Sequence, residues 1–160
     1  MEEEKKKKLS MVVFSGDMDK LFAAFSIALG AAAANMEVTM FFTFWGLRAL
    51  KKKVGTGKSL FGRMLGMMYG GDINRATPSK MSFGGIGRWM FKKMMNAKGV
   101  TPLPELRQTA LDLGVKMYPC QMSVDVMEIH PETMIDEVQG CVGVAFFVEQ
   151  AQQSEVSLFI

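Results

Sequence analysis

The sequence predicts an α/β protein, a three-layer α/β/α sandwich built on a mostly parallel sheet of about five strands. Short apolar runs rich in β-branched and aromatic residues alternate with longer helical stretches along the 160 residues, which is the pattern of strand-helix-strand units. The chain is also 49% hydrophobic and 22% charged, so it can bury one full core. We therefore expect a single domain over residues 1–160, with an insertion at about 46–99.

The first strands and helix are predicted at the N-terminal end. The apolar run LSMVVF, residues 9–14, precedes Ser15-Gly16-Asp17, which favours a turn followed by a helix start. Residues 19–34, DKLFAAFSIALGAAAA, are apolar on nearly all sides, so we expect a helix packed against the sheet. Residues 37–45, EVTMFFTFW, have the composition of a strand that is buried on both faces.

Residues 46–99 interrupt this alternation, and we interpret them as an insertion. The segment is rich in glycine and methionine, and it carries a basic stretch at residues 48–53. Methionine fills irregular cores and also lines adaptable contact surfaces, so core or oligomer packing and a lid or docking surface both stay open. Lys92 and Lys93 lie beside Trp89 and Phe91, which makes a peripheral contact with a membrane surface physically possible.

Regular structure is expected again after residue 100. Residues 101–115, TPLPELRQTALDLGV, have prolines near a helix start and Gly114 in a position that commonly ends a helix. VKMYPC, residues 115–120, predicts a short strand, and a helical segment follows through SVDVMEI. The last elements are a short helix from Pro131, a helix in GVAFFVEQAQQ and a final strand in EVSLFI. Parallel sheets of this kind place functional groups at the carboxyl ends of their strands.

Two glycine-rich motifs do not support nucleotide binding. GTGKS, residues 55–59, lacks the earlier glycine of a phosphate-binding loop because Lys52 occupies that position. GGIGRW, residues 84–89, fails the dinucleotide-binding pattern because Met90 stands where the last glycine is required. The formal net charge of +3 is mild, and we expect no nucleic-acid partner.

No metal or cofactor is expected either. His130 is the single histidine and directly precedes Pro131, and the two cysteines are far apart in sequence, which gives too few ordinary ligands for a zinc site. Paired carboxylates such as Asp136-Glu137 occur in a short polar segment and are assigned no chemistry.

Cys120 is the residue best placed for chemistry. It follows a predicted strand and directly precedes a helix-like segment, so its sulfur should lie near backbone N–H groups and the positive end of a helix dipole. Such a setting stabilises thiolate, the form that attacks a disulfide or accepts sulfane sulfur. Ser123 can donate a hydrogen bond to the sulfur or cap the helix, while Asp125 opposes thiolate unless it faces away. Free cysteine is also among the most buried residue types, so a structural role stays open.

Cys141 is a possible second thiol. We place it at the start of the last predicted helix, where the same dipole argument applies in weaker form because its sequence neighbours are more apolar. If the fold brings it close to Cys120, the two can act as attacking and resolving thiols. The alternative is a packed helix cysteine.

The setting is expected to be a reducing cytoplasm. Two cysteines are not a disulfide framework, and the N-terminal EEEKKKK run is not followed by a signal-peptide cleavage site. No apolar run reaches the roughly 18–20 uninterrupted residues that a spanning helix needs. We therefore do not expect an integral membrane protein.

Four stretches of the sequence carry a resemblance to a known family. The segments SGDMDKLFAAFSIALGAAAANMEVTMFFTFWGL, PSKMSFGGIGRWMFKKMM, PCQMSVDVM and EVSLFI together resemble the DsrE-like family of sulfur-trafficking proteins, over nearly the whole chain. The resemblance is closest to a subgroup that has a Met- and Gly-rich insertion. It implies a YchN-like fold, homo-oligomers that are trimeric or larger, and a cysteine that exchanges sulfur with small TusA-like or rhodanese-like carriers.

In that subgroup the cysteine of the C-x-M-S-x-D-V-M element is the expected sulfur carrier, which falls on Cys120. Better-studied DsrE proteins carry their cysteine in a different local context, so substrate and direction of transfer do not carry over. A peroxiredoxin activity finds no support, because the threonine-to-cysteine peroxidase motif is absent.

We therefore expect a cytoplasmic sulfur carrier or sulfurtransferase that holds sulfane sulfur on Cys120 as a persulfide or thiosulfonate and relays it to an acceptor thiol. The alternative is a non-catalytic oligomeric binding module, which uses the Met-rich insertion to dock a partner or a membrane surface. Thiol accessibility separates them: a carrier needs an exposed sulfur, while a structural cysteine is slow to alkylate until the protein unfolds.

Overall fold

A four-stranded parallel sheet lies at the centre of the computed structural model, which describes residues 6–69 and 71–160. The strands are β1 (Lys8–Val13), β2 (Glu37–Phe42), β3 (Lys116–Pro119) and β4 (Val156–Phe159), in the order β3-β2-β1-β4. All three neighbouring pairs are parallel, as predicted. About five strands were expected; in place of a fifth, a one-residue parallel bridge joins Cys120 to Val142 beyond the end of β3.

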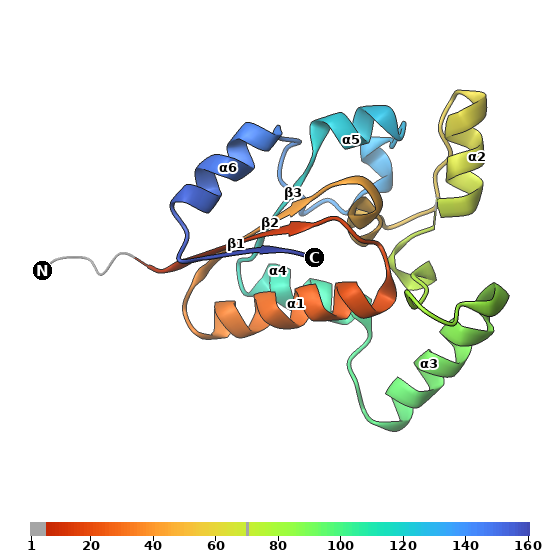
Figure 1. The fold of residues 1–160 in the computed structure, drawn as a ribbon, viewed down its shortest axis with the longest axis horizontal. Helices are drawn as coiled ribbons and strands as arrows, with labels where there is room; N and C mark the ends of the chain where they lie inside the picture. Colours follow the sequence, from red (N-terminus) through yellow and green to blue (C-terminus); the bar gives the residue numbers. More distant parts are fainter. Residues whose placement is uncertain (1–5, 70) are drawn as a thin grey trace, which may run out of the picture.

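Helices cover both faces of the sheet, which confirms the three-layer architecture. Figure 1 shows α1 (Met18–Ala33) and α4 (Leu103–Asp112) on one face, and α5 (Gln121–Val126) and α6 (Val144–Gln152) on the other. Outside residues 46–99, the strand and helix positions follow the sequence pattern within a few residues, whereas the helices within that segment were not predicted. Gly114 has a positive φ of 82° after α4, the left-handed conformation that glycine adopts most easily at a helix end.

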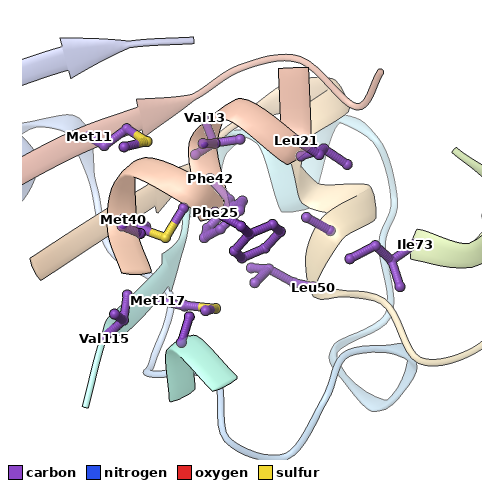
Figure 2. Close-up of a cluster of buried hydrophobic side chains, with 14 of the residues drawn as sticks. Met11, Val13, Leu21, Phe25, Met40, Phe42, Leu50, Ile73, Val115 and Met117 are labelled. Carbon is purple, nitrogen blue, oxygen red and sulfur yellow. The ribbon is translucent and has the colours of Figure 1, made fainter. Parts of the chain in front are cut away.

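The main core lies between α1, α4 and the sheet. Buried positions of α1 recur every three or four residues, at Met18, Leu21, Ala24, Phe25, Ala28 and Ala31, so one side of the helix faces the strands. Figure 2 shows Phe25 at the centre of this cluster, near Phe42 of β2, with the two ring centroids 6.4 Å apart. Burying one such side chain contributes about 1.5–3 kcal/mol, so this face anchors the fold.

The opposite face has a much thinner cover. Its buried cluster consists of Val12, Phe41 and Cys120, with Tyr118, Val142 and Phe147 packed against it. Among the described residues, α6 has no buried side chain. We therefore expect the α6 layer to open at a lower free energy than the α1 layer.

The expected insertion divides into an inner and an outer part. A 3-10 helix, η1 (Phe44–Leu50), is packed into the main core through Leu47, Ala49 and Leu50. The following α2 (Leu60–Tyr69) and α3 (Ile86–Ala97) project from the body on the side to which the carboxyl ends of the strands point (Figure 1).

Short 3-10 turns complete the described structure. They are η2 (Ile73–Arg75) and η3 (Phe83–Gly85) in the insertion and η4 (Pro131–Thr133) after α5.

Most methionines of the insertion are exposed, which does not match core packing within one chain. They are Met64, Met67, Met68, Met81, Met90 and Met94. Across the described part of the chain, no helix combines the length and hydropathy required to cross a bilayer.

Candidate thiol site at the carboxyl edge of the sheet

The candidate site is located where β2 and β3 end. Thr43 follows β2 and Cys120 follows β3, so both lie at the carboxyl edge of the parallel sheet, where α/β folds place ligands. The Cys120 N–H donates to the Phe42 carbonyl at 2.8 Å, which attaches the start of α5 to the end of β2. This position at a strand-to-helix junction agrees with the sequence prediction.

The Cys120 side chain is turned into the apolar cluster under α6. The residue is 1% exposed and packs with Val12 and Phe41, while the ring of Phe147 stacks on Phe41 at 5.5 Å between centroids. Cys120 occupies the N-cap position of α5 but makes no side-chain capping hydrogen bond. The sulfur expected to be exposed beside helix N–H groups is instead buried among aromatic and aliphatic side chains.

The backbone accounts for the difference. The first N–H of α5, that of Gln121, donates to the Val142 carbonyl at 3.0 Å, and the Val142 N–H donates to the Pro119 carbonyl at 3.0 Å. These bonds lay the segment before α6 across the start of α5. The α5 helix is also only six residues long, so its dipole is small.

Ser123 does not interact with the sulfur. Its hydroxyl is fully buried and forms a hydrogen bond of 2.8 Å with the Thr43 hydroxyl. This bond ties α5 to the residue that follows β2. Ser123 is therefore a positioning residue in this structure, and Thr43, which the sequence reasoning missed, is its partner.

Asp125 faces solvent, as the sequence reasoning required for a carboxylate near a reactive thiol. Its Oδ1 accepts a hydrogen bond from Gln121 Nε2 at 2.8 Å. The side chain lines an open hollow together with Cys141, Lys58, Ser59 and His130. Asp125 therefore lies in the same hollow as Cys141.

Cys141 lies in the loop before α6, so the prediction that it begins the last helix is wrong: Gly143 is the N-cap and the helix starts at Val144. The glycines on either side of the Cys141-Val142 pair favour this extended connection. Burial, followed by the charge of Asp125 and the nearby Cys120 thiol, raises the pKa of the Cys141 thiol. Cys141 is half-buried and, at neutral pH, mostly protonated.

Both cysteines are free thiols, and one is buried directly beneath the segment that carries the other. Among the described residues, no three His, Cys, Asp or Glu side chains lie together in a group that could hold a metal ion. His130 contributes to the wall of the hollow near Cys141.

Comparison with known proteins identifies the family. A model of the DsrE/DsrF/DrsH-like family matches residues 5–159. The chain is 38% identical to the protein YrkE of Bacillus subtilis over 159 residues, which cover 98% of this chain and 99% of the relative. It is 36% identical to the sulfur carrier protein DsrE2 of Allochromatium vinosum over 160 residues, which cover 96% of this chain and 98% of that protein.

The fold is also similar to a solved structure. The crystal structure of the ychN protein from E. coli superposes with a TM-score of 0.56 at 10% identity, covering 96% of this chain and 99% of the other. This likeness confirms the predicted YchN-like fold. The family match over nearly the whole chain shows that the protein belongs to the DsrE/DsrF/DrsH-like family.

Proposed function

We propose that this protein is a sulfur carrier that holds sulfane sulfur on Cys120 as a persulfide and passes it to an acceptor thiol. The observation that carries the proposal is the placement of Cys120 at the carboxyl edge of the sheet, beside the loop of a second free thiol, in a chain 36% identical to a named sulfur carrier. Small TusA-like or rhodanese-like proteins in the cytoplasm are the proposed donors and acceptors.

Loading is a two-electron exchange that needs no external oxidant. The Cys120 thiolate attacks the outer sulfur of a donor persulfide, the S–S bond of the donor breaks, and the donor leaves as a thiolate. With thiosulfate as donor, the same attack transfers the outer sulfur and releases sulfite. Unloading reverses the roles, with an acceptor thiolate attacking the outer sulfur of the Cys120 persulfide.

The burial of Cys120 does not match the exposed sulfur expected of a carrier, so the proposal requires a cover that moves. The apolar shell keeps water and small reductants away from a persulfide, and α6 makes few buried contacts with the rest of the protein. Displacement of α6 exposes the sulfur during transfer. A docked carrier protein that binds the displaced state favours this opening.

The test is intact-protein mass spectrometry with peptide mapping after incubation with a persulfidated carrier or thiosulfate. Wild-type protein should gain one sulfur atom on Cys120, removable by dithiothreitol, and Cys120→Ser should gain none. Cys141→Ser serves as the matched control, since it removes the other thiol and should still load. Loading of Cys120→Ser to the wild-type extent contradicts the proposal.

A second function, docking to an anionic membrane surface, is favoured by the exposed outer part of the insertion. Helix α2 has a continuous outward apolar face formed by Leu60, Phe61, Met64, Met67 and Met68. Residues 46–99 hold twelve of the 19 basic side chains but one of the 16 acidic ones. Exposed apolar side chains among basic residues are typical of helices that lie in a membrane interface.

Helix α3 has the same character. Its exposed apolar residues include Ile86, Trp89 and Met94, which are all more than half exposed, and the Lys93 ammonium lies 5.2 Å from the Trp89 ring centroid. Arg88 and Lys92 instead turn to the body and donate to backbone carbonyls of η2. The apolar side of α3 therefore faces outward.

Flotation with vesicles tests this second function. Wild-type protein should float with vesicles that contain anionic lipid and remain at the bottom with neutral vesicles. The double variant Trp89→Glu, Met94→Glu should lose flotation, while Val144→Glu, Val148→Glu, on the exposed face of α6, should keep it. If the wild-type protein stays at the bottom with every kind of vesicle, membrane docking is excluded. If the Trp89→Glu, Met94→Glu variant instead breaks an oligomer, this face of α3 binds a second copy of the chain.

A further inference from the structure

A small cavity separate from the two thiols collects buried positive charge. It lies between η1, α2 and the turn that follows α5, and its lining includes Arg48, Lys51, Tyr69, His130 and Thr133. The residues of η1 come directly after β2, so the cavity opens at the carboxyl edge of the sheet. Neither thiol lines it.

Lys51 is the first unusual feature of this cavity. The residue is 6% exposed, yet within residues 6–69 and 71–160 its Nζ forms no hydrogen bond or ion pair. Its neighbour Lys52 behaves as a surface lysine, with its Nζ 2.6 Å from Asp136 Oδ1 in an exposed ion pair. Buried lysines are rare unless they have a partner, and the described residues supply none for Lys51.

Arg48 is the second unusual feature. One of its terminal nitrogens, Nη2, donates to the Tyr69 carbonyl at 3.3 Å, and its guanidinium carbon lies 5.1 Å from the centroid of the Tyr69 ring. Its Nε is buried without a hydrogen-bond partner. None of the ion pairs among the described residues includes Arg48.

The electrostatics of the two side chains agree with the geometry. Burial lowers the pKa of Lys51, and the positive charge of Arg48 lowers it further. Burial likewise lowers the pKa of Arg48. The cavity wall also contains the Glu128 carboxylate, whose Oε2 accepts the Ser59 N–H at 2.9 Å, so Arg48, Lys51 and Glu128 together leave one net positive charge. Neither cation forms an ion pair among the described residues, so a bound anion would offset the cost of burying this excess positive charge.

We propose that Arg48 and Lys51 form a binding site for a small inorganic oxyanion. One terminal atom of the oxyanion occupies the enclosed part of the cavity. The enclosed space measures ≈ 20 Å³, enough for a group about the size of one water molecule. A nucleotide or a second protein is therefore too large for the enclosed part. Charge-assisted donors of this kind favour oxyanions such as thiosulfate, sulfate and phosphate.

The site includes Leu65, Gly66 and Tyr69 of α2, so a bound oxyanion fastens the projecting α2 helix to the body. The proposal does not depend on sulfur loading at Cys120.

Thermal unfolding with thiosulfate, sulfate and phosphate, each against sodium chloride at equal ionic strength, tests the site. At ten times the dissociation constant, an oxyanion should raise the melting temperature of the wild-type protein by roughly 3–6 °C. Lys51→Met should melt at or above the wild-type temperature without oxyanion and lose most of the oxyanion-dependent rise. Lys53→Met, a change in the exposed neighbouring lysine, should keep the full rise.

Titration of wild-type protein with thiosulfate, followed by ¹H–¹⁵N NMR, covers the case in which Lys51→Met does not fold. Saturable shifts at Lys51, Tyr69 and His130 support the site. Equal effects of chloride and oxyanions, or an undiminished response in a folded Lys51→Met variant, overturn it.

Discussion

Removal of the Phe147 ring should make Cys120 accessible without unfolding the protein. Phe147 is the α6 residue that reaches the buried cluster around Cys120 and stacks on Phe41, with ring planes 25° apart. Because α6 has few other buried contacts, Phe147→Ala should weaken the attachment of this helix while the α1 side of the core stays intact. Alkylation of Cys120 then reports how often α6 opens.

The size of the effect follows from the burial of the ring. Truncation of a fully buried phenylalanine costs about 3–5 kcal/mol, and Phe147 is only half-buried, so we expect about 1.5–2.5 kcal/mol. If α6 opens and closes quickly relative to the chemical step, a tenfold rate change corresponds to about 1.4 kcal/mol. Cys120 should therefore be alkylated roughly 10- to 70-fold faster in Phe147→Ala than in a wild-type background.

The assay is the rate of iodoacetamide modification in a Cys141→Ser background, read by mass spectrometry. The matched control is Phe22→Ala, a similar truncation of a partly buried ring of α1 on the opposite face. It should lower global stability and leave the Cys120 rate nearly unchanged. Rapid alkylation of Cys120 before any substitution, or equal acceleration by both variants, would refute the view that α6 is a local cover.

Three further predictions address the thiols, the positioning bond and assembly. Asp125→Asn should lower the pKa of Cys141, because it removes a negative charge that raises it; the pH profile of Cys141 alkylation in a Cys120→Ser background should move to lower pH. Thr43→Val should reduce the unfolding free energy by about 1–3 kcal/mol in urea titrations, since it leaves the buried Ser123 hydroxyl without its partner, and the double variant with Ser123→Ala should lose less than twice that. Phe159 is 71% exposed on the edge strand β4 and stacks on Phe14, so Phe159→Asp should shift the homo-oligomer that the family resemblance implies toward monomer in light scattering.

The elements of the sheet and its packed helices could be predicted because their periodic patterns are clear, while α2 and α3 of the insertion could not. The runs that became β1, β2 and β4 are short and apolar, and α1 has apolar residues at helical spacing. The position of Cys120 after β3 followed from the same pattern.

The direction of the Cys120 side chain did not follow from that pattern. Strands of a parallel sheet are apolar on both faces, so alternation does not reveal that Tyr118 and Cys120 face α6 while Met117 faces the main core. Two hydrogen bonds made by Val142, which lies some 20 residues further along the chain, cover the space beside Cys120.

The basic run at 51–53 raises the same difficulty. One of its three lysines is buried, and nothing in their order distinguishes Lys51 from its neighbours.

The two thiol environments lead to a last prediction, on the lifetime of the proposed Cys120 persulfide. The Cys141 thiolate can attack the inner sulfur of that persulfide, which forms a Cys120–Cys141 disulfide and releases hydrosulfide. Because the pKa of Cys141 is raised, little thiolate is present at neutral pH, and this loss should be slow.

Raising the pH from 7 toward 9 should shorten the lifetime of the loaded wild-type protein, as the thiolate fraction of Cys141 grows up to about tenfold per pH unit below its pKa. Cys141→Ser should keep its sulfur over the same range, since serine is not an effective nucleophile toward a persulfide. Loaded protein mixed with no acceptor, quenched at intervals and analysed by intact mass, distinguishes persulfide, disulfide and free thiol. Equal, pH-independent loss from both proteins would mean that Cys141 has no part in resolving Cys120.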